Sequence, residues 1–325
     1  MPDSTKPATF VEPMECLSVS KPPEGPQWLW ELKWDGYRAV AVKGSTVKLY
    51  SRNHKSHDKK FPYLAEALSE LPNETVVDGE IVALDDQGRP NFNLLQNFIS
   101  EADRIRYFIF DVLHHKGRDL TGLTLVERRK LLDALKISSP RIKISDYVEA
   151  DSSVLLEGAK EQHLEGIIGK RKDSRYEAGT RTGSWIKYRL NLGQEFVVGG
   201  FTPGPHGLDA IIVGYYRGKD LIYVARTRNG FVPASRQRLF ERLKSLTTSD
   251  CPFVNLPETR KARWGEALTA DKMKKCVWVR PEIVAQLEFL EWTDADHLRH
   301  SRFVGLREDR AARMVVKEQA ESPPR

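Results

Sequence analysis

The stretch ELKWDGYRA (residues 31–39) is the part of the sequence around which the first half of the chain is organised. An alternating apolar run precedes it and another follows it, and both runs predict β-strands. Asp35-Gly36 is typical of a tight turn, so we expect a hairpin that holds the amine of Lys33 at the rim of a sheet. A solvated lysine beside an ordinary turn fits this stretch equally well, so the choice depends on the sequence downstream.

Several later strand-like runs carry charged or aromatic residues. TVVDGEIVA (residues 75–83) places Glu80 in an apolar strand, which is costly unless the carboxylate is used. RYFIFDVL (residues 106–113) contains Phe110, and EGIIGKR (residues 165–171) begins with Glu165. In SWIKYRL (residues 184–190), Lys187 and Arg189 alternate with apolar residues and therefore share one face of a strand. These two cations are expected to converge on a negatively charged group.

Together these residues suit a nucleotide site in which Lys33 attacks phosphorus. A lysine amine attacks only in its deprotonated form, which cationic neighbours or a metal ion favour. Lys187, Arg189 and a Mg²⁺ ion held by carboxylates would have this effect and would also stabilise phosphate charge. The sequence lacks the G-x-x-x-x-G-K-[ST] pattern, so a P-loop is excluded.

Length and composition indicate a soluble protein of two domains. The chain has 325 residues, of which 40% are hydrophobic and 30% charged. It has no apolar run long enough to cross a membrane, and its first residues lack a signal core, so we expect a cytoplasmic protein. The three cysteines lie far apart without C-x-x-C spacing, which argues against disulfides and structural zinc.

The second half of the chain differs from the first in charge and in texture. Residues 191–325 hold 22 Lys and Arg against 17 Asp and Glu, whereas the first 190 hold 29 against 28. This asymmetry fits a polyanionic partner, although an ordinary solvated surface can also carry it. Beyond residue 190 short strand-like runs alternate with turns around one helical stretch, which predicts a small barrel of the oligonucleotide-binding kind.

Six motifs occur in a fixed order: KWDGYR, SRN, DGE, FIFD, EGIIGK and SWIKYR. The set resembles the ATP-dependent DNA ligases of the covalent nucleotidyltransferase superfamily, most closely the small ligase modules of bacterial nonhomologous end-joining. The resemblance implies an α+β nucleotidyltransferase (adenylation) domain at residues 1–190 and an all-β OB-fold barrel at residues 191–311. A C-terminal tail would follow at residues 312–325. The implied reaction seals nicks in DNA during repair through a lysine adenylate.

The resemblance also assigns roles to single residues, and Lys33 would be the adenylated lysine. The residues expected to hold the nucleotide or the nick phosphate are Glu31 and Arg38 (adenine and ribose, or the nick), Arg52 (ribose or the terminal hydroxyl side), Glu80 (ribose or metal), Phe110 (stacking on adenine), Arg181 (phosphate), and Lys187 and Arg189 (α-phosphate). Glu80 and Glu165 would bind the metal. In the barrel, RFVGLREDR (residues 302–310) resembles the last motif, in which Arg302 and Arg307 would orient pyrophosphate.

The implied cofactors are ATP and Mg²⁺ (or Mn²⁺), and the implied partners are nicked double-stranded DNA and a Ku-type end-binding protein. A monomer is expected, with no membrane partner. The family usually ends its last motif with Asp-Lys, whereas this chain has Asp309-Arg310, and Arg and Lys are not equivalent. An mRNA capping-type guanylyltransferase, an RNA ligase, and an inactive nucleic-acid-binding module remain alternatives.

Overall fold

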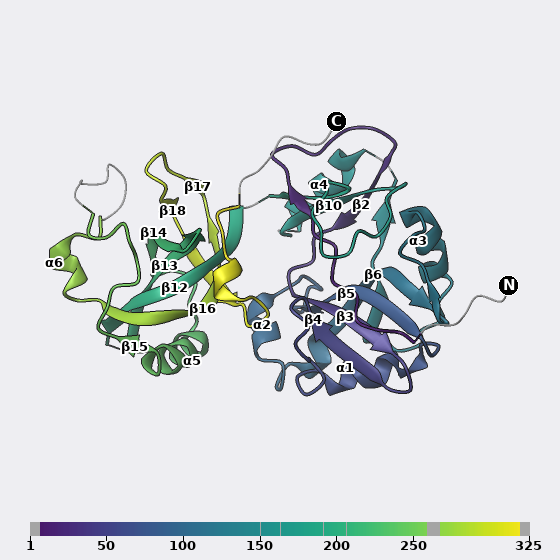
Figure 1. Cartoon of the computed structure of the whole chain (residues 1–325), viewed down its shortest axis with the longest axis horizontal. Coiled ribbons are helices and arrows are strands. Elements are labelled where there is room, and N and C mark those ends of the chain that lie inside the picture. The colour runs from purple at the N-terminus through teal and green to yellow at the C-terminus, as the bar shows by residue number, and fades with distance from the viewer. Residues whose placement is uncertain are drawn as a thin grey trace. The chain divides into compact units, whose positions relative to one another are not determined.

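The structure is a computed structural model that describes residues 7–149, 151–162, 164–190, 192–205, 207–258 and 267–318. The chain separates into two compact units, one reaching Leu190 and the other spanning Asn191–Glu318. Each unit has its own hydrophobic core. Helices and strands are mixed in the first unit, whereas long strands dominate the second (Figure 1).

One sheet of the first unit carries the motif strands at its centre. Its strands, in spatial order, are β1 (Leu17–Ser18), β11 (Trp185–Arg189), β10 (Gly166–Arg171), β2 (Trp28–Leu32) and β9 (Tyr147–Val148). Helix α4 (Ser152–Glu161) covers one face, where Trp28, Trp30 and Ile167 pack with Ala159. Because side chains alternate along a strand, the intervening residues of β2 and β10 point to the opposite face.

The second sheet of this unit has six strands. Five follow the order β4 (Val47–Ser51), β3 (Tyr37–Lys43), β5 (Thr75–Ala83), β6 (Ile105–His115) and β7 (Arg118–Asp119), and β8 (Ile142–Ile144) pairs with β6. The helices connected to it are α1 (Pro62–Ala67), η1 (Leu68–Glu70), α2 (Phe92–Gln96), η2 (Ala102–Arg104) and α3 (Leu125–Asp133). Helix α3 begins at a capping box in which Thr124 and Glu127 satisfy each other's backbone amides.

The inner faces of these two sheets share one buried cluster. Leu29 and Trp185 come from the first sheet, Val40 and Phe110 come from the second, and Tyr176 joins them from a loop. This packing fixes the strands that carry the predicted motifs with respect to one another.

The expected hairpin at Asp35-Gly36 is wrong. Strand β2 pairs with β9 and β10, whereas β3 pairs with β4 and β5, so residues 33–36 cross from one sheet to the other. Gly36 is required at this crossing, because a Cβ there would lie 2.1 Å from the carbonyl oxygen of Ile81. The local pattern identified both strands, but contacts with strands far along the chain decided their partners.

The second unit is a curled sheet in which all named strand pairs of the described residues are antiparallel. Its strands are β12 (Leu192–Gly204), β13 (Gly207–Arg217), β14 (Asp220–Thr227), β15 (Thr247–Thr248), β16 (Val277–Phe289) and β19 (Arg302–Leu306), with β17 (Glu291–Trp292) and β18 (Leu298–Arg299) as a separate ribbon. Helices α5 (Pro233–Lys244), α6 (Ala270–Met273) and η3 (Ala312–Met314) complete the unit. Register shifts in β12 and β13 bend these long strands.

The segment that follows β19 lies against this sheet as far as residue 318. Val315 is 2% exposed, and its carbonyl oxygen accepts a hydrogen bond from the Tyr216 amide at 2.7 Å. The rest of the predicted tail, residues 319–325, lies outside the described residues.

Candidate active site

Lys33 lies one residue beyond the end of β2, and its position is fixed by its backbone and its side chain. Its amide donates to the Gly166 carbonyl at 3.0 Å, which continues the pairing with β10. Its Nζ forms an ion pair with Glu165, and Arg189 Nε donates to the other oxygen of that carboxylate at 3.2 Å. All three side chains keep between 14% and 17% of their surface exposed, so a ligand can reach them.

The carboxylate of Glu165 stands between two cations. Burial raises the pKa of Glu165, but the charges of Lys33 and Arg189 outweigh burial and hold that pKa below its usual value. The sequence predicted cations around Lys33, whereas the structure places this anion between Lys33 and Arg189. Gly166 makes the approach possible, since it has φ +152° and a Cβ would lie 2.1 Å from the Tyr188 carbonyl oxygen.

Glu31 and Lys187 lie on the same face of the sheet. Both are paired with Ile168 of β10, one from β2 and one from β11. Lys187 is half-buried, whereas Glu31 is 2% exposed and accepts a hydrogen bond from Lys170 Nζ at 2.8 Å. We did not predict Lys170 as a site residue from the sequence. It is two residues after Ile168 on β10, so both side chains point to the same face of the sheet.

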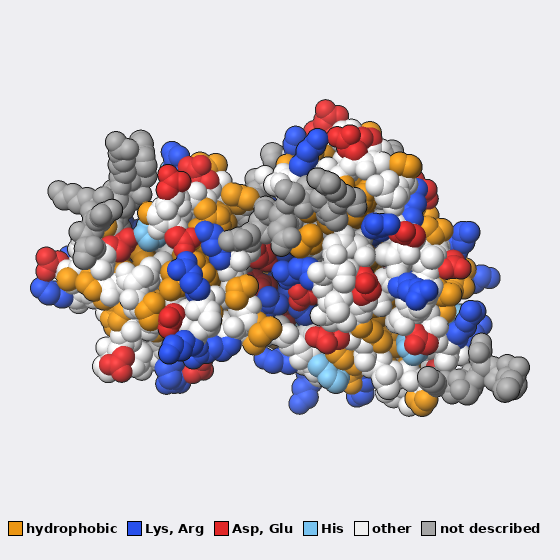
Figure 2. Space-filling model, turned by 45° about the horizontal axis from the view of Figure 1, so that its top comes forward, with side chains coloured by type: hydrophobic (Ala, Val, Ile, Leu, Met, Phe, Trp, Pro, Cys, Tyr) orange, Lys and Arg blue, Asp and Glu red, His pale blue; other side chains and the backbone are white. Residues whose placement is uncertain are grey.

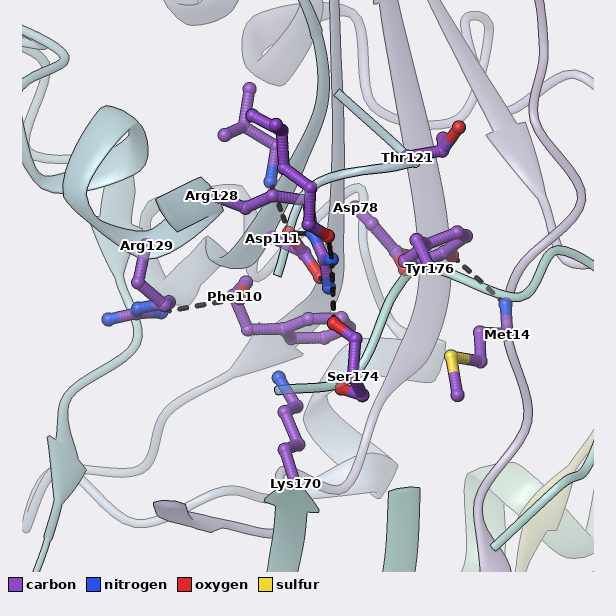
Figure 3. A network of polar contacts seen from close by, with 12 residues as sticks. Met14, Asp78, Phe110, Asp111, Thr121, Arg128, Arg129, Lys170, Ser174 and Tyr176 are labelled. Carbon is purple, nitrogen blue, oxygen red and sulfur yellow. Dashed lines mark hydrogen bonds and ion pairs between the residues drawn. The ribbon is translucent and has the colours of Figure 1, made fainter. Parts of the chain in front are cut away.

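Lys170 is enclosed by aromatic rings. Its Nζ lies 4.3 Å from the ring centroid of Phe110 and 4.3 Å from that of Trp185. Burial lowers the pKa of Lys170 and outweighs the attraction of Glu31 and Asp111, which acts in the opposite direction. Figure 3 shows this amine directed at the Phe110 ring.

Phe110, the predicted adenine-stacking residue, is 8% exposed and already has cations on its ring. The Arg38 guanidinium lies 4.7 Å from its centroid, in addition to Lys170. A second aromatic pair was missed by the sequence analysis: Trp34 and Phe108 are stacked with centroids 3.9 Å apart and planes inclined by 24°. Trp34 follows Lys33 directly, so this pair offers another flat apolar surface close to Lys33.

Arg38 and Glu80 are brought together on the second sheet. They are directly paired across β3 and β5, and Glu80 is also paired with Phe108 of β6. Arg38 is held by Asp78, which accepts from its Nε and its Nη2 at 2.6 Å each. Asp78 belongs to the same DGE motif as Glu80, but the sequence analysis gave it no role.

Two further arginines of the first unit, Arg52 and Arg181, were predicted to contact the substrates. Arg52 is half-buried in the turn after β4, and Arg181 forms an exposed ion pair with Glu15 of the N-terminal segment. Among the ion pairs of the described residues, Glu165 is bound by Lys33 and Arg189 and not by Arg52 or Arg181.

The carboxylates predicted to bind a metal suit Mg²⁺ only if the nucleotide supplies further ligands. No group of three or more His, Cys, Asp and Glu side chains with metal-binding geometry is found among the described residues. Mg²⁺ is commonly held by one or two carboxylates together with phosphate oxygens and water. Glu80 on β5 and Glu165, which immediately precedes β10 and pairs with Lys33, would supply the carboxylates of such a donor set.

In the second unit, the two predicted pyrophosphate contacts differ sharply. The side chain of Arg302 is 61% exposed and lies 3.6 Å from Glu288. Arg307 is 7% exposed, and its guanidinium contacts Asp309 at 3.1 Å and Glu195 at 3.5 Å. Arg310, which is half-buried, contacts the other oxygen of Glu195 at 3.0 Å, so one carboxylate of β12 binds both arginines.

The surface and the helices give two further observations. Figure 2 shows Lys and Arg side chains interspersed with Asp and Glu over the face in view, so the basic surplus does not form one patch there. Among the described residues, no helix has the length and apolar character that crossing a membrane requires.

Comparisons with known proteins agree with these features. Residues 13–189 match the ATP dependent DNA ligase domain, and residues 205–310 match the ATP dependent DNA ligase C terminal region. The chain is 34% identical over 329 residues to the multifunctional non-homologous end joining protein LigD of Pseudomonas aeruginosa, covering 97% of this chain and 37% of that relative. DNA ligase C of Mycobacterium tuberculosis is 30% identical over 345 residues, covering 96% of this chain and 94% of the relative.

Among solved structures, mycobacterial DNA ligase D complexed with ATP and MES has a TM-score of 0.69 at 31% identity, covering 95% of this chain and 98% of that one. These matches confirm the expected nucleotidyltransferase core and OB-fold barrel of an ATP-dependent DNA ligase. Because the two ligase matches fall one in each unit and DNA ligase C aligns along nearly its whole length, the chain belongs to the ATP-dependent DNA ligases.

Proposed function

We propose that Lys33 is the nucleophile with which this chain seals nicks in double-stranded DNA. Lys33 Nζ would attack the α-phosphate of ATP and release pyrophosphate, forming a lysine adenylate. The adenylate would pass to the 5′-phosphate at the nick, and the 3′-hydroxyl would then displace AMP. The observation that carries this proposal is the Lys33–Glu165–Arg189 cluster on motif strands of a chain that belongs to the ligase family.

The charged residues around Lys33 have distinct tasks in this proposal. Glu165 orients the amine, while Lys187 and Arg189 stand on one strand to meet the α-phosphate. A Mg²⁺ or Mn²⁺ ion held by Glu80, Glu165 and phosphate oxygens would neutralise phosphate charge. Adenylation should therefore stop in a chelator and return when Mg²⁺ is added, and robust adenylation in the chelator would contradict the metal site.

The remaining predicted residues would hold other parts of the substrates. Their roles remain as the resemblance assigned them: Glu31 and Arg38 for adenine and ribose or the nick phosphate, Phe110 for adenine, Arg52 for ribose or the terminal hydroxyl side, Glu80 for ribose or metal, Arg181 for a phosphate, and Arg302 and Arg307 for pyrophosphate. For Phe110 and Arg181 this requires a rearrangement, because cations already cover the first and Glu15 pairs with the second. For Arg307 it requires release from Glu195 and Asp309.

The test uses ATP or GTP labelled at the α-phosphate. We expect label from ATP on the wild-type chain, none on Lys33→Ala, and normal labelling of Lys48→Ala, a lysine of β4 whose side chain is 54% exposed. Labelling from GTP alone would instead indicate a capping-type guanylyltransferase. A labelled chain that seals only nicks with RNA on the 3′ side would be an RNA ligase, and an unlabelled chain would be a silent binding module.

The biological setting is part of the same proposal. The LigD relatives are named for non-homologous end joining, but the chain spans 37% of the length of the Pseudomonas aeruginosa protein. We place this ligase in bacterial end joining, as a cytoplasmic monomer that works with a Ku-type end-binding protein. Co-purification with such a protein and sedimentation of the free chain test these two points.

Binding to the DNA backbone should depend strongly on salt. The surplus of five cations over anions in residues 191–325 would follow phosphates without reading sequence. We expect affinity for a nicked duplex to fall steeply as salt rises, and to change little with the sequence around the nick. Affinity that resists salt would contradict a phosphate-based contact.

A further inference from the structure

Asp78 is a fully buried carboxylate of the first unit, and it binds the guanidinium of Arg38. It is 0% exposed on β5, and it accepts from Arg38 Nε and Nη2 at 2.6 Å each. This two-pronged contact restricts the guanidinium to one plane and one direction. A buried carboxylate of this kind needs further partners, because each unsatisfied oxygen lone pair costs free energy.

Tyr176 supplies such a partner from a different part of the chain. Its hydroxyl donates to Asp78 Oδ2 at 2.6 Å and accepts from the Met14 amide at 3.0 Å. Arg38 Nη2 also donates to the Met14 carbonyl at 3.3 Å, so the contacts close into a ring. Figure 3 shows Tyr176 between Met14 and Asp78. Tyr176 itself is 4% exposed and cannot touch a large ligand.

The loop that presents Tyr176 is held in place by a second buried pair. Arg128 of α3 and Asp111 of β6 are both 0% exposed and make two hydrogen bonds of 2.8 Å. Arg128 Nη1 also donates to the carbonyl of Ser174 at 3.1 Å, two residues before Tyr176. The Tyr176 amide donates to the Thr121 carbonyl at 2.9 Å. The hydroxyl therefore has a fixed position relative to Asp78.

We propose that Tyr176 is a positioning residue which, through Asp78, fixes the guanidinium of Arg38 for binding ATP or the nick phosphate. This rests on the proposed function, in which Arg38 holds the adenosine of ATP or the phosphate of the nick. A preoriented arginine loses less side-chain entropy when it binds phosphate than a mobile one. Tyr176→Phe removes the hydroxyl alone, so it loosens the ring while keeping the aromatic packing against Trp185.

The test separates the steps of the reaction. Tyr176→Phe is compared with wild type in adenylation by ATP, in sealing of a nicked duplex, and in sealing of a nick that already carries AMP. We expect a loss of about tenfold, the value of roughly one hydrogen bond to a charged group. A loss in adenylation would assign Arg38 to ATP, whereas a loss confined to the two nicked substrates would assign it to the nick phosphate.

The matched control is Tyr107→Phe. Tyr107 is also buried, and its hydroxyl donates to the Ala39 carbonyl at 2.8 Å rather than to the Asp78 carboxylate. We expect this variant to lose some thermal stability while its rates stay within about twofold of wild type, because it removes a buried tyrosine hydroxyl that makes no hydrogen bond to the group that holds Arg38. Equal rate losses in the two variants would overturn the inference.

Arg38→Gln provides the second control. In this background Tyr176→Phe should cause no further loss of rate, because the group that it positions is gone. Independent, additive losses would show that the hydroxyl acts only on stability and would overturn the inference. If the wild-type chain itself forms no adenylate, the proposed function fails, which is a different result from any change confined to Tyr176→Phe.

Discussion

Two lysine–glutamate pairs join β2 to β10, and they differ mainly in their access to solvent. Lys33 follows β2 and pairs with Glu165, which precedes β10, and their side chains are 17% and 15% exposed. Lys170 of β10 pairs with Glu31 of β2, and there the exposures are 2% and 3%. The same two residue types thus pair twice between these strands, once at the ends of the strands and once beneath aromatic rings.

The difference in exposure supports the catalytic role proposed for Lys33 and a structural role for Lys170. An amine can attack phosphorus only where the nucleotide can approach it, and only the pair at Lys33 leaves that path open. The pair at Lys170 is closed by Phe110 and Trp185, where breaking it would leave an uncompensated buried charge. The partner residues are alike, so residue type alone does not separate nucleophile from structural cation.

The largest effect is expected for Lys33→Ala. Adenylation should fall by roughly ten-thousandfold or more because the nucleophile is removed. The variant should unfold at nearly the wild-type temperature, because its pair is partly exposed. Labelling with ATP measures adenylation, and a thermal melt measures stability. A labelled Lys33→Ala chain would show that another residue is the nucleophile.

Glu165→Gln should have the next largest effect. It keeps the size of the side chain but removes the charge between Lys33 and Arg189, so the amine loses its orientation and the phosphates lose a metal ligand. We expect adenylation to fall by roughly a hundredfold to a thousandfold. Adenylation rates measured over a range of Mg²⁺ concentrations check this prediction. An unchanged dependence on Mg²⁺ would show that Glu165 is not a metal ligand.

Lys170→Met should act on stability. It leaves the Glu31 carboxylate buried without its cation, which costs about 3–5 kcal/mol in comparable pairs. The double variant Glu31→Gln with Lys170→Met should recover most of this loss, because no buried charge remains. Urea unfolding measures both variants, and a fully stable Lys170→Met chain would show that this pair is not structural.

The smallest effect is expected when the pH is lowered, and it concerns the contribution of Glu165 to stability. Because Lys33 and Arg189 hold the pKa of Glu165 below its usual value of about 4.5, this group stabilises the fold above that pH. The contribution is lost as the pH falls below 4.5 and passes through the folded-state pKa. The difference in melting temperature between wild type and Glu165→Gln should therefore shrink in acid, and a constant difference would contradict the coupling.

The sequence by itself determined the ligase motifs, and from it we predicted Lys33 as the nucleophile and a division of the chain near Leu190. Charged residues in apolar runs, such as Glu80, Lys187 and Arg189, indicated the site. Burying a charged side chain costs free energy, so such residues are expected where they have a function. The change to short strands after residue 190 predicted the barrel. These signals lie within a few neighbouring residues, where alternation and turn preferences act.

Only the tertiary structure decided which residues meet. Lys33 and Glu165 are 132 positions apart, and Lys170 and Glu31 are 139 apart, so no local pattern could pair them. The same holds for β2 and β3, which a local reading joined in a hairpin and the structure places in different sheets. Partners of this kind are chosen by packing between distant strands, and that packing left one lysine open to a nucleotide and closed the other beneath Phe110 and Trp185.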